Sequence, residues 1–208
     1  MKKILFIIPM ALCALCLASC DKGDIIPLVR LGSRQSVITL NDAGAGSTGF
    51  DIISDGDYAA EVAEGAEWLR IDECTQNRLE VSFFANKGFR RAAKIRISKG
   101  SRVDSMYVRQ PGAYNGFIRF SQTVFAVPAA GGSYSVDVAS NLAPSTLVPE
   151  ALNAEVVRYL RFENNVLSFD VLPATDMNRR NYTVSLYCLD GWGERVQADL
   201  TLTQEAAQ

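Results

Sequence analysis

The feature that most restricts the fold of this chain is an internal repeat. Five segments of the first half recur in the same order in the second half, displaced by 87 to 94 positions. The matched segments are 35–40 with 122–127, 68–71 with 159–162, 79–83 with 167–171, Arg90-Arg91 with Arg179-Arg180, and Gln110 with Gln204. A repeat at nearly constant spacing means that one structural unit occurs twice. We therefore predict two copies of one domain, at 32–112 and 113–208.

Apolar and polar residues alternate along both copies, which is the period of a β-strand with one buried face. The alternation is clearest at Leu79, Val81 and Phe83 in the first copy and at Leu167, Phe169 and Val171 in the second. Helical periodicity is weak apart from one candidate helical turn at 149–157. The predicted fold class is all-β, with two tandem immunoglobulin-like antiparallel β-sandwich domains after a lipoprotein signal peptide. Trp68 begins a strand and is predicted to lie in the core.

Residues 1–19 have the order of a bacterial export signal. Lys2 and Lys3 precede an apolar run at 4–15, which is too short to span a bilayer. The next residues, Leu17-Ala18-Ser19-Cys20, resemble the lipobox of bacterial lipoproteins, in which the cysteine thiol takes up a diacylglyceryl group. We predict that 1–19 is a signal peptide and that Cys20 carries lipid, including palmitate-type acyl chains, which tie the protein to a membrane. Residues 20–31 then form a short tether.

Charge and cysteine content exclude several classes of function. Once Lys2 and Lys3 are set aside with the signal, 21 basic residues become 19, against 23 acidic residues and no histidine. A nucleic-acid-binding domain is expected to be basic, and histidine is the commonest general base. Cys74 and Cys188, the two cysteines after Cys20, are too few for a disulfide framework and are predicted to be small buried hydrophobic residues. We predict no enzymatic activity, no cofactor, no metal ion and no nucleic-acid partner.

Several segments of the first copy resemble the BACON domain of Bacteroidota lipoproteins and glycan-degrading enzymes. These segments are the turn Ile53-Ser54-Asp55-Gly56-Asp57-Tyr58, the strand start Glu67-Trp68-Leu69, the hairpin segment 89–93 and the closing segment 108–112. Tyr58 stands where the family usually has tryptophan. The second copy departs further, with Tyr159 in place of the tryptophan in Trp-Leu. The resemblance implies an immunoglobulin-like sandwich, a carbohydrate- or mucin-binding role, and a lipoprotein on the periplasmic or cell-surface face of the outer membrane.

Two aromatic residues are candidate ligand contacts, because sugar recognition uses exposed aromatic faces. Trp192 lies in a glycine-containing turn between the last two predicted strands of the second copy. Its indole is either a ligand platform or a lid over the edge of its own sandwich. Tyr58 occupies a turn in the first copy, where it either contacts a ligand or packs on its own domain.

Charged and hydroxyl side chains supply three further candidate sites. Arg90, Arg91, Lys94 and Arg96 form a candidate patch for an anionic partner, although Lys94 and Arg96 would also suit a solvated sheet face with acidic neighbours across the strands. Asp104-Ser105-Met106 resembles the acceptor of Bacteroidota O-glycosylation, which makes Ser105 a candidate modification site. The last candidate is a weak cation site at Asp51, Asp55 and Asp57, although their glycine-containing segment favours a turn held by aspartate side chains.

Two functional hypotheses follow. The first is a lipid-anchored envelope protein that binds polysaccharide or host glycans, as an accessory or adhesive module of a polysaccharide-handling system. The second is a structural spacer or assembly partner of other envelope proteins that binds no ligand of its own. Coplanar exposed aromatic residues on one face would favour the first hypothesis, and an extended rod with bare faces would favour the second.

Overall fold

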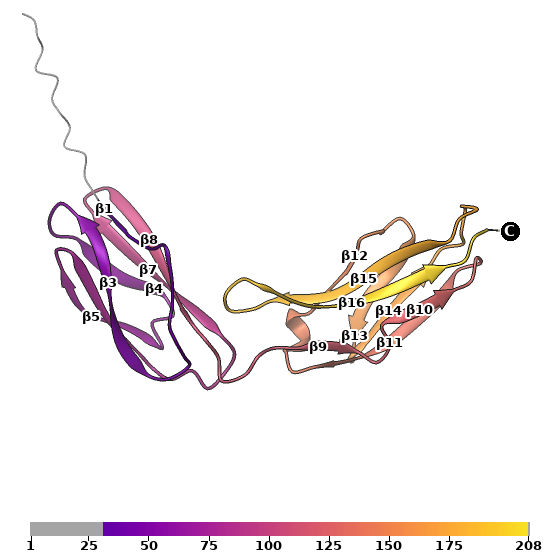
Figure 1. The fold of residues 1–208 in the computed structure, drawn as a ribbon, viewed down its shortest axis with the longest axis horizontal. Helices are drawn as coiled ribbons and strands as arrows, with labels where there is room; N and C mark the ends of the chain where they lie inside the picture. The colour runs from indigo at the N-terminus through magenta and orange to yellow at the C-terminus, as the bar shows by residue number, and fades with distance from the viewer. Residues whose placement is uncertain (1–30, 208) are drawn as a thin grey trace, which may run out of the picture.

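The computed structural model describes residues 31–207, and Figure 1 shows their fold. The predicted signal peptide at 1–19 and the predicted lipidation site Cys20 lie outside the described residues. Within the described part, the chain forms two β-sandwiches, one from β1 to β8 and one from β9 to β16. The predicted all-β fold of two tandem immunoglobulin-like sandwiches is confirmed.

The first sandwich consists of two four-stranded sheets with the orders β1-β3-β6-β5 and β2-β8-β7-β4. In chain order as A, A′, B, C, D, E, F and G, these sheets are A-B-E-D and A′-G-F-C, the arrangement of an immunoglobulin-type sandwich. Strands β2 and β8 pair in parallel. The strands are β1 (Leu31–Ser33), β2 (Val37–Thr39), β3 (Gly46–Ser54), β4 (Ala59–Glu64), β5 (Leu69–Thr75), β6 (Arg78–Phe83), β7 (Arg91–Lys99) and β8 (Arg102–Gln110).

The second sandwich repeats this topology strand by strand. Its sheets have the orders β13-β14-β11-β9 and β10-β16-β15-β12, and β10 pairs with β16 in parallel. The strands are β9 (Ile118–Phe120), β10 (Val124–Val127), β11 (Gly132–Ser140), β12 (Val148–Ala151), β13 (Val157–Glu163), β14 (Val166–Val171), β15 (Arg180–Leu189) and β16 (Arg195–Gln204).

Each sandwich buries its own core, built from alternate residues of facing strands. Ile95 and Ile97 of β7 are fully buried, whereas Arg96 between them is exposed. The same alternation in β16 buries Leu200 and Leu202. The two clusters of buried residues have no member in common, so each domain removes its own apolar surface from water.

The closing glutamines confirm the repeat at the level of single hydrogen bonds. Gln110 and Gln204 end β8 and β16, and both are almost completely buried. Nε2 of Gln110 donates to the carbonyl of Phe84 at 3.1 Å, and Nε2 of Gln204 donates to that of Leu172 at 2.8 Å. Phe84 and Leu172 follow the E strands β6 and β14, so each glutamine joins the two sheets of its sandwich.

The sequence match of Trp68 with Tyr159 is wrong. Trp68 is 2% exposed, as predicted for a core residue, and its carbonyl accepts a hydrogen bond from Phe84 N at 2.9 Å. The equivalent bond in the second domain runs from Leu172 N to the carbonyl of Val156, at 3.0 Å. Val156 therefore takes the place of Trp68. Tyr159 is 82% exposed instead.

A β-bulge explains why Tyr159 points outward. The pairing of β13 with β14 shifts register between Arg158 and Arg161, and Tyr159 within the bulge has a φ of 51°. An inserted residue turns the side chains that follow it toward the opposite face. Positive φ is uncommon for a bulky residue and costs free energy.

Three other sequence predictions have mixed outcomes. The candidate helical turn at 149–157 is wrong, because this segment forms β12 and a turn, while a short 3-10 helix lies earlier, at Pro144–Thr146. Cys188 is buried as predicted, but Cys74 is exposed.

In the part of the chain that the structure describes, no helix has both the length and the apolar character needed to cross a membrane.

The two sandwiches lie end to end in Figure 1, with the linker between β8 and β9 on one side of the junction. The long hairpin of β15 and β16 extends out of the second sandwich toward the first. Its turn, at 190–194, reaches the end of the first domain where β7 begins and β8 finishes.

Candidate functional site at the junction of the two domains

The turn between β15 and β16 is held in shape by Asp190. Its Oδ1 accepts hydrogen bonds from the backbone nitrogens of Trp192 at 2.8 Å and Glu194 at 3.1 Å. Its backbone pairs with Glu194 and Gly193, and Gly193 has a φ of 75° that suits glycine. Aspartate commonly organises turns in this way. The turn therefore presents Trp192 in a fixed orientation.

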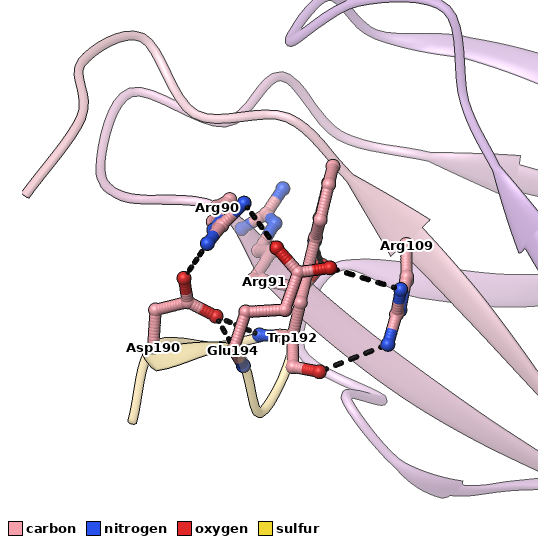
Figure 2. Close-up of polar contacts among 6 residues, drawn as sticks. All are labelled: Arg90, Arg91, Arg109, Asp190, Trp192 and Glu194. Atoms are coloured by element: carbon pink, nitrogen blue, oxygen red, sulfur yellow. Dashed lines mark hydrogen bonds and ion pairs between the residues drawn. The ribbon is translucent and has the colours of Figure 1, made fainter. Parts of the chain in front are cut away.

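Trp192 packs against the first domain. Its Nε1 donates a hydrogen bond to the carbonyl of Arg91 at 3.0 Å, and its own carbonyl accepts one from Arg109 at 2.9 Å. The guanidinium carbons of Arg90 and Arg109 lie 4.8 Å and 5.5 Å from the ring centroid. Cation–π contacts of this kind contribute about 0.5–2 kcal/mol each. Figure 2 shows the indole between the arginines of the first domain.

Two acidic residues of the turn complete the contact. Oδ2 of Asp190 is ion-paired with Arg90, and Glu194 reaches Arg90 at 2.9 Å and Arg109 at 3.5 Å. The side chain of Asp190 is only 7% exposed. Removing one member of a buried ion pair is much more costly than removing one from an exposed pair, so a change at Asp190 that leaves Arg90 unpaired should weaken the contact between the domains. We call Arg90, Arg91, Arg109, Asp190, Trp192 and Glu194 the junction cluster (Figure 2).

Gly191 allows the backbones of the two domains to approach closely. A Cβ atom on Gly191 would overlap the carbonyl oxygen of Arg90 and lie 2.9 Å from the Cα atom of Arg91. Both are backbone atoms, which move aside less easily than the end of a side chain. Glycine at this position is therefore a requirement of the interdomain contact rather than of the turn alone.

Arg91 connects the junction to the first core. Its guanidinium lies over Trp68, 4.4 Å from the ring centroid, and donates to Gln110 Oε1 at 2.9 Å and to the carbonyl of Phe84 at 2.8 Å. Burial lowers the pKa of Arg91, an effect that nearby Glu67 partly offsets. Because its side chain is held by these partners, the backbone carbonyl that receives Trp192 is fixed in place.

Two hollows flank the turn. One, of about 400 Å³, is lined by residues of both domains and the linker, including Phe89, Leu142 and Cys188. The other, of about 420 Å³, lies beside Trp192 and includes Tyr107 and Arg109. Ligand sites occur preferentially at such domain interfaces.

The two alternatives considered for Trp192 are both inaccurate. The indole is neither a free platform nor a lid on its own sandwich, because its polar contacts are with the first domain. Sequence reasoning missed Asp190, Glu194 and Arg109 as its partners. A signal was present in the complementary charges of the Asp-Gly-Trp-Gly-Glu turn and the Arg90-Arg91 segment, but the pattern did not show that they meet.

The four residues of the predicted anionic-partner patch have different partners within the chain. Arg90 and Arg91 belong to the junction cluster, whereas Arg96 pairs with Glu61 on the neighbouring strand at 3.2 Å. Lys94 lies over the ring of Tyr107, with its Nζ 5.8 Å from the centroid. Arg90 is paired with Asp190 and Glu194, and the side chain of Arg91 is held by Trp68 and Gln110. The binding of an anionic partner by this patch stays a prediction.

Tyr58 packs on its own domain. It contacts the first core, and its hydroxyl donates to the carbonyl of Arg78 at 3.0 Å. Burial, with a smaller effect of nearby Cys74, raises the pKa of Tyr58 to about 12. The hydroxyl joins the turn after β3 to the start of β6, so it is already used within the fold.

The remaining candidate residues lie on the first domain. Ser105 is a half-buried residue within β8, paired with Arg96. Asp51 lies within 4 Å of Arg34 and Arg78, and Asp55 pairs with Lys99. Across residues 31–207 no group of three or more acidic, cysteine or histidine side chains is arranged to hold a metal ion.

Tyr159 is an exposed residue that sequence reasoning placed wrongly. It is the most exposed large hydrophobic residue among those described, and the exposed Arg158 and Arg161 flank it. The sequence match with Trp68 hid this position, since a bulge cannot be seen from an offset in spacing.

Comparisons with known proteins add no family assignment. Neither a protein-family model nor a curated protein sequence matches the chain. Solved structures with some similarity include a chimeric titin Z1Z2 tandem (TM-score 0.40, 12% identity, covering 87% of this chain and 98% of that one). They also include protocadherin gamma B2 cadherin domains 3–6 (TM-score 0.36, 11% identity, covering 85% of this chain and 47% of that one).

An endo-fucoidan hydrolase of glycoside hydrolase family 107 is similar at a TM-score of 0.34 and 10% identity, over 86% of this chain. The chain spans only 29% of the length of that hydrolase. The TM-scores of all three structures are below 0.5, so the immunoglobulin-like topology rests on the strand order of each sandwich and not on these similarities.

Proposed function

We propose that the chain is a lipid-anchored envelope protein whose two immunoglobulin-like domains form a structural spacer or assembly module with a defined interdomain geometry. The observation that carries this proposal is the junction cluster. Its ion pairs, indole hydrogen bond and cation–π contacts all join the β15–β16 turn to the first domain (Figure 2). A protein that needed only two independent domains would not need such a contact.

The contacts that the two candidate ligand-binding residues make within the chain support the same function. Trp192 and Tyr58 are the aromatic residues that favoured glycan binding, and both are used inside the molecule. The end-to-end arrangement in Figure 1 suits a spacer that begins at a membrane tether. Attachment through Cys20 belongs to this proposal and rests on the signal-like residues before it.

The test is a distance measurement between the two domains of the full-length protein, purified in detergent. Exposed Cys74 carries one spin label, and Ser135→Cys on the exposed face of β11 carries the other. We expect a narrow distance distribution by pulsed electron spin resonance. The double change Asp190→Asn with Glu194→Gln should broaden it.

Glu150→Gln is the matched control, because it removes an ion pair with Arg195 inside the second domain and leaves the junction intact. It should keep the narrow distribution. A broad distance distribution in the labelled protein that keeps Asp190, Glu194 and Glu150 would refute the spacer proposal.

Glycan binding is the second candidate function, and one observation favours it. Tyr159 is 82% exposed, has a φ of 51° and lies between Arg158 and Arg161, which suits contact with a sugar ring and acidic substituents. The resemblance of 53–58 and 67–69 to BACON sequences supports this candidate as well. Glycan-array binding that is lost in Tyr159→Ala and kept in Trp192→Phe would establish it, and no binding to any glycan would leave the spacer function.

A further inference from the structure

The more apolar of the two hollows at the junction has walls from three parts of the chain. Phe89 comes from the first domain, Gly116 from the linker, and Leu142, Cys188 and Val196 from the second domain. Its volume of about 400 Å³ lies within the range of small-molecule sites, which are mostly apolar with a few polar groups. Because neither domain forms this hollow alone, it exists only when the junction is closed.

The charges in its wall are already compensated. Arg90 and Asp190 both line the cavity and are paired with each other, and Arg90 also reaches Glu194 at 2.9 Å. A charged ligand would lose its hydration without gaining an unpaired partner, which is unfavourable. An uncharged ligand has no such penalty, and its apolar surface would gain from contact with Phe89, Leu142 and Val196.

The polar groups of the lining are too few for a sugar. Asn115 and Thr146 are its uncharged side chains with hydrogen-bonding groups. The Thr146 hydroxyl already donates to the carbonyl of Ala143 at 2.7 Å. A sugar carries a hydroxyl on most of its carbons and needs many directed partners, whereas this lining can orient about one polar group.

We propose that this cavity, here called the junction cavity, binds a small uncharged molecule that is mainly apolar and carries one polar group. Such a ligand contacts both domains at once and stabilises their closed arrangement, since binding to one state of an equilibrium favours that state. The proposal goes beyond the spacer function, because it adds a ligand that strengthens the interdomain geometry.

Cys188 provides a direct readout, because its buried thiol lines the cavity while exposed Cys74 lies on the first domain away from it. The full-length protein in detergent is treated with N-ethylmaleimide, and the alkylation of each cysteine is followed by peptide mass spectrometry. Benzyl alcohol is the neutral probe, and benzoate and benzylamine are charged probes of similar size. We expect benzyl alcohol to slow alkylation of Cys188 several-fold, to leave Cys74 unchanged, and to exceed both charged probes.

Two variants separate the cavity from general effects of the probe. Ala143→Phe should fill the cavity, so that adding benzyl alcohol no longer slows the alkylation of Cys188. Ala126→Phe, on an exposed position of β10, should retain the effect of benzyl alcohol. An unfolding transition of the second domain like that of the unmodified protein, followed by circular dichroism, shows that the Ala143→Phe protein is folded. No protection by benzyl alcohol, equal protection by the charged probes, or protection that survives Ala143→Phe would each overturn the proposal. None of these outcomes would alter the interdomain distance on which the spacer function depends.

Discussion

Asp190 shows how a single carboxylate can serve both a turn and an interface. Oδ1 organises the local backbone through Trp192 and Glu194, while Oδ2 pairs with Arg90 of the other domain. An asparagine side chain at this position would keep the first set of bonds and lose the charge for the second. The Asp190→Asn change therefore separates interdomain attraction from turn formation, whereas an alanine change would confound them.

Tyr58 makes the stability of the first domain depend on pH in the alkaline range. The folded protein favours the protonated phenol, because burial raises its pKa from 10.0 to about 12. Its contribution to the free energy of unfolding is complete below a pH of about 10 and is lost as the pH rises toward about 12. Tyr58→Phe should lower stability by about 1 kcal/mol near neutral pH, through the lost bond to Arg78, and should reduce the alkaline loss.

Urea unfolding of the full chain at about pH 8 and about pH 11 measures both effects of Tyr58→Phe. Tyr114→Phe is the control, since Tyr114 is 51% exposed in the linker. An alkaline loss of the same size in Tyr58→Phe and in the unmodified protein would contradict the assignment.

The backbone conformation of Tyr159 predicts that removing its side chain increases the stability of the second domain. Its φ of 51° is strained for a residue with a Cβ atom, whereas glycine adopts it without a steric penalty. Since its side chain is 82% exposed, little packing is lost when the ring is removed. Tyr159→Gly should stabilise the second domain by about 1 kcal/mol in urea unfolding. Tyr159→Ala keeps the Cβ atom and should give no gain, so an equal effect of both changes would show that backbone strain is not the cause.

At the level of strands, features that depend on neighbouring residues could be predicted from the sequence, whereas contacts between distant residues could not. The alternation at Ile95 and Ile97 follows from the period of a strand, so the sandwich could be predicted. The partner of Trp192 depends on which surfaces meet after both domains fold, and no period records that. The Tyr159 error has a third cause, because one inserted residue changes which face a side chain occupies.

The buried positions of the closing glutamines predict that replacing either one lowers the stability of its sandwich. Gln204→Leu preserves approximate volume but leaves the carbonyl of Leu172 without the amide donor at 2.8 Å. Because Gln204 is 1% exposed, water cannot replace that bond, and the change should lower stability by about 1–3 kcal/mol. Gln197→Leu on the same strand is exposed and should change stability by less than about 0.5 kcal/mol. Thermal unfolding followed by circular dichroism distinguishes them, and similar losses in both would refute a sheet-joining role for Gln204.

At the scale of the whole molecule, Gly191 offers a test that leaves every charge in place. A Cβ atom there would overlap the backbone of Arg90, so Gly191→Ala must either move the turn or separate the domains. Each sandwich has its own core and should stay folded, because the clash lies outside both clusters of buried residues. We expect the distance between labels at Cys74 and Ser135→Cys to lengthen and its distribution to broaden. In Gly88→Ala, where the Cβ atom would meet only Asn86 Oδ1 at 3.6 Å, both should stay as they are. If Gly191→Ala keeps the original distribution, the two backbones do not approach closely, and the defined interdomain geometry must come from the linker instead.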